Sequence, residues 1–218
     1  MDVASDSPKE GASKAPKRSK GPVANAIELA ATIAVAVGLA FLIQAFLVKP
    51  YRIPSGSMIP TLKIGQRILV NRLNTSPGVG DIVVFHPPSG ADSPNGTCGD
   101  PNQGSDHAQA CDKSLPSEST QTFVKRLVGL PGDHLQIRDG DVWRNGREER
   151  GSYVQPCNSG PADCNFPRTI TVPAGEYYMM GDNRGDSDDS RYWGPVPQKW
   201  IIGVAFATYW PIDRIGFF

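Results

Sequence analysis

The feature that most constrains this chain is a run of twenty residues without a charged side chain. Residues 29–48 read LAATIAVAVGLAFLIQAFLV. A helix rises about 1.5 Å per residue, so twenty residues span about 30 Å, which is the thickness of a bilayer's hydrocarbon core. The run predicts a transmembrane anchor, whose boundaries we set at residues 23–48.

A cleaved signal peptide is the alternative, because its apolar region also lies near an N-terminus. That region spans only about 7–15 residues before a cleavage site made of small residues. Ala34-Val35-Ala36 has the composition of such a site, but the apolar run continues for twelve residues beyond it. The length of the run therefore favours a retained anchor.

The flanks of the anchor predict its orientation. Residues 14–20, KAPKRSK, carry four positive charges, and such clusters stay on the cytoplasmic side of a membrane. Lys49 and Arg52 on the far side weaken this bias. We expect a single-pass plasma-membrane protein in which residues 1–22, polar and without apolar periodicity, form a disordered cytoplasmic tail. Residues 49–218 then form an extracytoplasmic domain.

The four cysteines fit that topology. Cys98 and Cys111 bracket one polar segment, and Cys157 and Cys164 bracket another. Their spacings match no zinc-binding pattern of the CxxC type. An even number of cysteines in polar loops predicts two local disulfides and an oxidising compartment. Four unpaired thiols, or pairing between the two loops, remain alternatives.

Composition favours a mostly β domain after the anchor. The chain has 23 Gly and 20 Pro, which break it into short β-branched runs, and no long amphipathic helix follows residue 48. Asp139-Gly140 predicts a β-hairpin turn. The runs that resemble strands are residues 67–71, 81–86, 122–130, 134–138, 141–145, 169–172, 176–180 and 200–210.

One polar segment interrupts this pattern. Residues 89–121 contain no Val, Ile, Met, Phe, Tyr or Trp and include Cys98 and Cys111. Such a stretch cannot build a core of its own. We expect it to be a surface insertion held by those two cysteines.

Charge and histidine content exclude several functions. With 22 basic and 22 acidic residues the net charge is zero, which implies no strong field for binding a polyanion and argues against a nucleic-acid-binding protein. His86, His107 and His134 lie in no Ser/His/Asp-like context, and no histidine–carboxylate spacing fits a catalytic metal. We therefore expect no metal and no cofactor, and a hydrolase would need a base other than histidine.

Three short motifs carry candidate chemistry, and PSGSMIP (54–60) is the first. Its flanking prolines restrict the backbone and Gly56 permits positive φ. Such a turn can present a hydroxyl group and free backbone N–H groups, which a nucleophile and an oxyanion hole require. An inert turn is the alternative.

The second motif is the strand-like FVKRLV (123–128). Because side chains alternate along a strand, Lys125 shares a face with Phe123 and Leu127 and lies where an apolar residue is expected. Arg126 occupies a similar position on the other face. A lysine among apolar groups has a lowered pKa and can accept a proton from a serine. The alternative is an edge strand whose two basic side chains reach water.

The third motif is GDNRGDSDDSR (181–191), which follows a strand-like run. It lacks the glycine and glutamate positions of an EF-hand calcium loop. Arg184-Gly185-Asp186 is also the tripeptide of integrin ligands, which leaves a membrane-tethered adhesion module as one alternative. A solvated polar loop is the other.

Together and in this order, the motifs resemble those of type I signal peptidases, the membrane-bound bacterial leader peptidases. The resemblance spans residues 50 to about 207, except for 89–121, and rests on four segments: PSGSMIPTL (54–62), GDIVVF (80–85), FVKRLVGLPGD (123–133) and GDNRGDSDDSR (181–191). It implies a catalytic domain of coiled antiparallel β-sheets behind one transmembrane helix. It also implies a monomeric serine endopeptidase that removes signal peptides from exported preproteins at the membrane surface, after small, Ala-x-Ala-like residues.

The resemblance also implies roles for individual residues. Ser57 corresponds to the nucleophile and Lys125 to the general base of a Ser–Lys dyad, while Ser55 corresponds to a donor to the oxyanion and Ser187 to the serine that orients the lysine. Three further residues correspond to structural groups beside the site: Arg126, Asp189 and Arg191. Gly185 and Asp186 depart from the residues usual in the family, which leaves the fine geometry of that loop open.

Three other functions compete with this one. Self-cleaving repressors of the LexA type also use a Ser–Lys pair, but they are soluble and bind DNA, which the anchor and the zero net charge oppose. An adhesion module would keep its function without Ser57. An inactive homologue acting as a scaffold is opposed by the presence of both Ser57 and Lys125.

Overall fold

The computed structural model describes residues 21–104, 108–149, 151–158 and 160–218. The chain divides into two compact units, the first ending at Leu42 and the second running from Ile43 to Phe218. Nearly all of the predicted tail, and His107, lie outside the described residues.

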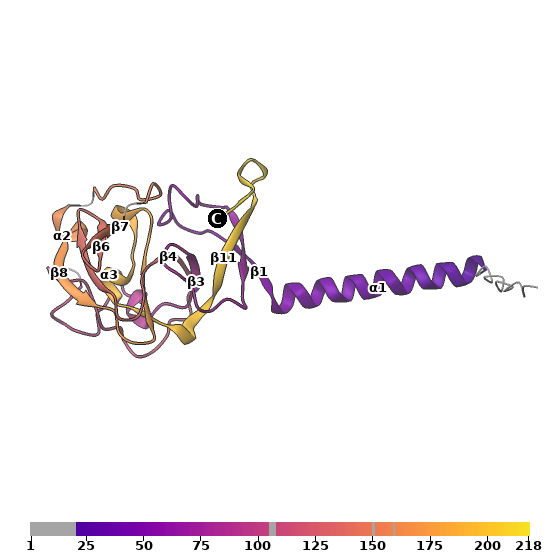
Figure 1. Ribbon diagram of the computed structural model, residues 1–218, viewed down its shortest axis with the longest axis horizontal. Helices are drawn as coiled ribbons and strands as arrows, with labels where there is room; N and C mark the ends of the chain where they lie inside the picture. Colours follow the sequence, from indigo (N-terminus) through magenta and orange to yellow (C-terminus); the bar gives the residue numbers. More distant parts are fainter. Residues whose placement is uncertain (1–20, 105–107, 150, 159) are drawn as a thin grey trace, which may run out of the picture. The chain divides into compact units, whose positions relative to one another are not determined.

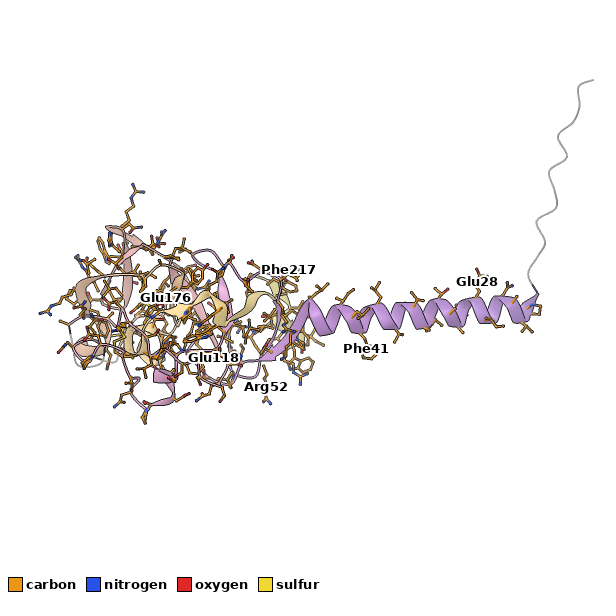
Figure 2. All side chains as sticks on the ribbon, turned by 90° about the horizontal axis from the view of Figure 1, so that it is seen from below. Glu28, Phe41, Arg52, Glu118, Glu176 and Phe217 are labelled. Carbon is orange, nitrogen blue, oxygen red and sulfur yellow. A yellow bond between two sulfur atoms is a disulfide. The ribbon has the colours of Figure 1, made fainter. Side chains whose placement is uncertain are left out.

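The first unit contains most of helix α1 (Pro22–Phe46). The helix is long and apolar enough over Pro22–Ile43 to cross a membrane. Its apolar side chains, such as Phe41, are exposed on all sides rather than along one stripe (Figure 2), which is typical of a helix solvated by lipid. The helix ends at Phe46, before the predicted boundary at residue 48, because the chain becomes a strand at Val48.

The second unit is mostly β, as predicted, and is built from two antiparallel sheets (Figure 1). The larger has the order β1-β2-β11-β3-β4-β9-β10, with β12 paired to β11, and the smaller has the order β7-β6-β5-β8. The strands of the larger sheet are β1 (Val48–Arg52), β2 (Arg67–Asn71), β3 (Ile82–Phe85), β4 (Phe123–Gly129), β9 (Glu176–Met180), β10 (Val196–Pro197), β11 (Ile201–Trp210) and β12 (Gly216–Phe217). Those of the smaller sheet are β5 (His134–Arg138), β6 (Asp141–Arg144), β7 (Arg147–Glu149) and β8 (Phe166–Thr171).

The larger sheet is coiled because some of its strands pair irregularly. The register of β11 shifts against both β2 and β3, and the register of β4 shifts against β9. Such bulges bend a strand and increase its twist. Figure 1 shows β8 on the opposite side of the domain from β1 and β11.

Each predicted strand-like run overlaps an observed strand, and the hairpin at Asp139-Gly140 is confirmed between β5 and β6. Both turn residues have positive φ, 53° and 85°, as a two-residue hairpin turn requires. The sequence pattern missed β1, because an edge strand tolerates Pro50 and needs no apolar alternation. It also missed three very short strands and the short helical segments: η1 (Ser89–Asp92), α2 (Pro161–Cys164), η2 (Arg184–Asp186), α3 (Ser190–Trp193), η3 (Gln198–Trp200) and η4 (Ile212–Arg214).

Segment 89–121 is not confined to the surface. Ala91 and Ala110 are buried in two different core clusters, and Cys111 is fully buried. Alanine is small enough to fill a gap between larger side chains, so the segment joins cores that other elements build. Cys98 is bonded to Cys111 and Cys157 to Cys164, so each pair closes one local loop.

Candidate active site

The strand order places Lys125 inside the larger sheet. Strand β4 lies between β3 and β9, so the alternative of an edge strand with two exposed basic side chains is wrong. Lys125 is 4% exposed and Arg126 is 7% exposed. Arg126 pairs with Met180 at the end of β9, so the loop that begins at Gly181 leaves the sheet beside Lys125.

The turn that carries Ser57 connects β1 to β2 and is fixed at both ends. Ile53 and Met58 are buried in the core, on either side of exposed Ser55. The loop after β9 holds the turn, because Asn183 donates its backbone N–H to the Ser57 carbonyl (3.0 Å) and its side-chain amide to the Gly56 carbonyl (3.2 Å). PSGSMIP is therefore a braced turn with a hydroxyl-bearing tip.

Four of the predicted site residues line one cleft of about 610 Å³: Ser55, Ser57, Lys125 and Ser187. Ser55 Oγ lies 3.4 Å from Ser57 Oγ. Lys125 Nζ donates a hydrogen bond to Ser187 Oγ (3.0 Å), and Lys125 and Ser57, both described, are not hydrogen-bonded to each other. Bonds between catalytic groups are often long before substrate binds and tighten in the complex.

Burial lowers the pKa of Lys125 to about 8, although the nearby charges of Asp189 and Asp188 partly oppose the shift. The Phe123 ring, whose centroid is 5.7 Å from Lys125 Nζ, forms part of the surroundings. A lysine with this pKa has a substantial neutral fraction near pH 8 and can then accept a proton. His86 and His134, the two described histidines, do not line the cleft.

Arg126 is paired with a residue that sequence reasoning missed. Its Nε and Nη2 atoms each lie 2.7 Å from a carboxylate oxygen of Asp182, which is fully buried. Thr61, which follows the Ser57 turn, donates to the same carboxylate (2.5 Å). The pair therefore joins β4, the loop after β9 and the Ser57 turn. The only sequence clue was an acidic residue two positions after a buried strand.

Asp189 and Arg191 form a second buried ion pair, and both are 0% exposed. Burial alone would raise the pKa of Asp189, but the charge and hydrogen bonds of Arg191 outweigh it, and that pKa lies below its usual value. Asp189 also accepts from the Gly181 N–H (3.1 Å), and Arg191 donates to the Ser187 carbonyl (3.1 Å). The pair thereby fixes the backbone on both sides of the loop.

The alternatives for the third motif are wrong. Arg184 is 3% exposed and donates to the carbonyls of Gly181 and Gly140. A buried arginine cannot be presented to an integrin-like receptor. Because Asp182, Asp189 and Arg191 are also fully buried, the loop is not a solvated polar segment.

Removing one charge of the Asp189–Arg191 pair should destabilise the fold. Asp189→Asn leaves the Arg191 charge buried and uncompensated, which typically costs about 3–5 kcal/mol of unfolding free energy. Glu149→Gln is the control, because Glu149 pairs with Arg144 where both side chains are partly exposed, and such a change costs about 0–1 kcal/mol. Urea unfolding at neutral pH measures both values, and equal small losses would contradict the structural role of the buried pair.

Comparison with known proteins identifies the family. The sequence matches the model of the family "Signal peptidase, peptidase S26" over residues 26–210. It is 37% identical to a probable signal peptidase I-1 of Synechocystis sp., over 84% of this chain and 81% of the relative. It is 34% identical to a signal peptidase I of Leptolyngbya laminosa, over 99% and 96%, and 33% identical to a signal peptidase I of Pseudomonas aeruginosa, over 82% and 71%.

These matches cover both α1 and the β domain that holds the cleft. Membership of this family agrees with the apolar N-terminal helix and with the mostly β fold of the structure. The chain belongs to the signal peptidase I family of serine hydrolases, whose members remove signal peptides from preproteins.

Proposed function

We propose that this protein removes N-terminal signal peptides from exported preproteins by means of a Ser57–Lys125 dyad, at the outer surface of the plasma membrane. Membership of the signal peptidase I family supports the reaction. The observation that carries the assignment of the dyad is a buried lysine with a pKa of about 8 in the same cleft as Ser57. A base of this kind makes a histidine unnecessary.

In the proposed reaction, neutral Lys125 accepts the Ser57 hydroxyl proton while Ser57 Oγ attacks the carbonyl carbon of the scissile bond. The Ser55 hydroxyl and the Ser57 backbone N–H donate to the oxyanion, and one such donor typically contributes about 2.7–4 kcal/mol. Lys125 then protonates the leaving amine. Water, activated by the same lysine, hydrolyses the acyl-enzyme. The bond from Lys125 Nζ to Ser187 Oγ keeps the amine aimed into the cleft.

The sequence distance between the anchor and the dyad supports the proposed location. Ser57 lies nine positions after Val48, and at full extension this length of chain spans at most about 32 Å. A preprotein's signal peptide holds its apolar region in the membrane and its cleavage site just beyond. Enzyme and scissile bond are thus confined to one thin layer, which lowers the entropic barrier to their encounter.

The proposed topology keeps residues 1–22 in the cytoplasm, residues 23–48 in the membrane and residues 49–218 outside. The cluster of positive charges at 14–20 supports the cytoplasmic N-terminus. The two disulfides, Cys98–Cys111 and Cys157–Cys164, agree with an oxidising environment for the domain. Substrates are preproteins with small, Ala-x-Ala-like residues before the scissile bond, and the enzyme acts as a monomer in the bilayer.

Replacing either member of the dyad should abolish cleavage. For Ser57→Ala and Lys125→Ala in detergent-solubilised full-length protein, we expect cleavage of an Ala-x-Ala preprotein to fall below about one thousandth of the wild-type rate. Ser76→Ala and Lys199→Ala, which alter exposed residues outside the cleft, serve as matched controls. Activity retained in Lys125→Ala would assign the base to another residue.

The rate should increase with pH through the titration of Lys125. Because only the neutral amine is a base and its pKa is about 8, kcat/KM should rise about tenfold per pH unit below pH 8 and level off above it. The Asp188 charge raises this pKa, so Asp188→Asn should move the rise to lower pH. A profile that is flat from pH 5 to 10 would show that Lys125 is not the base.

Gly181 should tolerate no side chain. A Cβ atom there would clash with Ser187 Oγ and with the Ser57 carbonyl oxygen, so Gly181→Ala must push the nucleophile turn and the lysine-orienting serine apart. A displacement of about 1 Å can lower the rate about 100-fold. Gly78→Ala is the control, because a Cβ atom at Gly78 meets no atom closer than 3.9 Å. Equal kcat/KM values for the two variants would refute this positioning role.

A further inference from the structure

Segment 89–121 lies against the cleft. Pro94 and Asn95 near its start, and Gln121 at its end, line the same cleft as Ser57 and Lys125. A segment predicted only as an insertion therefore forms part of the cleft beside Ser57 and Lys125.

One carboxylate joins the two parts of the segment that reach the cleft. Asp92 Oδ1 accepts from Ser119 Oγ (2.6 Å) and from Gln121 Nε2 (3.0 Å). Asp92 is only two residues from Pro94 in the chain. The start and the end of the segment are therefore held together where they form the cleft wall.

The middle of the segment is fixed to helix α3, which follows the loop after β9. The disulfide Cys98–Cys111 closes the segment, and the Cys111 N–H donates to the Arg191 carbonyl (3.0 Å). The chain at Gly96 comes so close that a Cβ atom there would lie 2.7 Å from Tyr192 Cβ. Asn95, next in the chain to Gly96, is thus held in place relative to the dyad.

Asn95 itself is exposed, and its side chain makes no hydrogen bond with any described residue. An asparagine side-chain amide offers two N–H donors and an acceptor oxygen. These groups can hydrogen-bond both the C=O and the N–H of a peptide backbone. Because the backbone around Asn95 is fixed, that backbone would lose little conformational freedom when the segment binds a polypeptide. Pro94 supplies an adjacent rigid apolar surface.

We propose that the cleft-lining residues of this segment, Pro94, Asn95 and Gln121, form a preprotein-binding wall. In this wall Asn95 hydrogen-bonds the backbone of the preprotein beside the scissile bond, and Pro94 contacts the same stretch. This rests on the proposed function, which supplies the ligand. Asn95 binds substrate without taking part in proton transfer, so its loss weakens binding and leaves the chemical step unchanged.

Binding measured without chemistry tests the proposal. In a full-length Ser57→Ala protein in detergent, the Kd for a fluorescent Ala-x-Ala preprotein should rise about fivefold with Asn95→Ala, as expected for one hydrogen bond. Asn95→Trp, which fills the cleft, should raise it about tenfold or more. Asn102→Ala is the matched control, because Asn102 is an exposed asparagine of the same segment that does not line the cleft.

The same changes in the protein with Ser57 intact separate the outcomes. For Asn95→Ala we expect a higher KM, with kcat, the midpoint of the pH profile and the melting temperature as in wild type. Unchanged Kd values for both Asn95 variants would overturn this inference while cleavage by wild type left the proposed function standing. A lower kcat at unchanged Kd would also overturn it. Wild type that neither cleaves nor binds the preprotein would overturn the proposed function and this inference together.

Discussion

The burial of one amine, Lys125 Nζ, is the constraint on which the rest of the site depends. Desolvation favours the neutral amine, and the carboxylates of Asp188 and Asp189 favour the charged one. Arg191 is paired with Asp189 and acts in the opposite direction on the pKa of Lys125. Without this counter-charge, a fully buried carboxylate would raise the pKa of the amine further and reduce the neutral fraction that the proposed general base requires.

The two buried ion pairs position loops more than they stabilise the domain. Burying two charges costs several kcal/mol in desolvation, which their attraction only roughly offsets. The pairs instead position the chain. Asp182 joins Arg126 to Thr61 beside the Ser57 turn, and Arg191 holds the backbone at Ser187. Each pair links chain segments that the sheets alone would leave free to move.

The alternation of apolar residues predicted most strands and marked Lys125 as a basic residue at a position where an apolar one is expected. Both predictions depend only on residues that are close together in the sequence. The partner of Arg126 was not predictable in this way. Asp182 is 56 residues away, and the two meet because β4 and β9 are neighbours, which a strand pattern does not specify. The position of segment 89–121 was not predicted either, because small buried residues such as Ala91 and Ala110 leave no apolar pattern in the sequence.

Helix α3 connects the chemistry of the cleft to its wall. The Arg191 guanidinium fixes the backbone at Ser187, whose hydroxyl accepts the bond from Lys125, while the Arg191 carbonyl accepts the bond that seats Cys111. The same residue thus holds the hydrogen-bond partner of Lys125 on one side and the disulfide-closed segment on the other. Because its side chain and its backbone are held by different partners, Arg191 links the loop around Ser187 to the segment that carries Asn95.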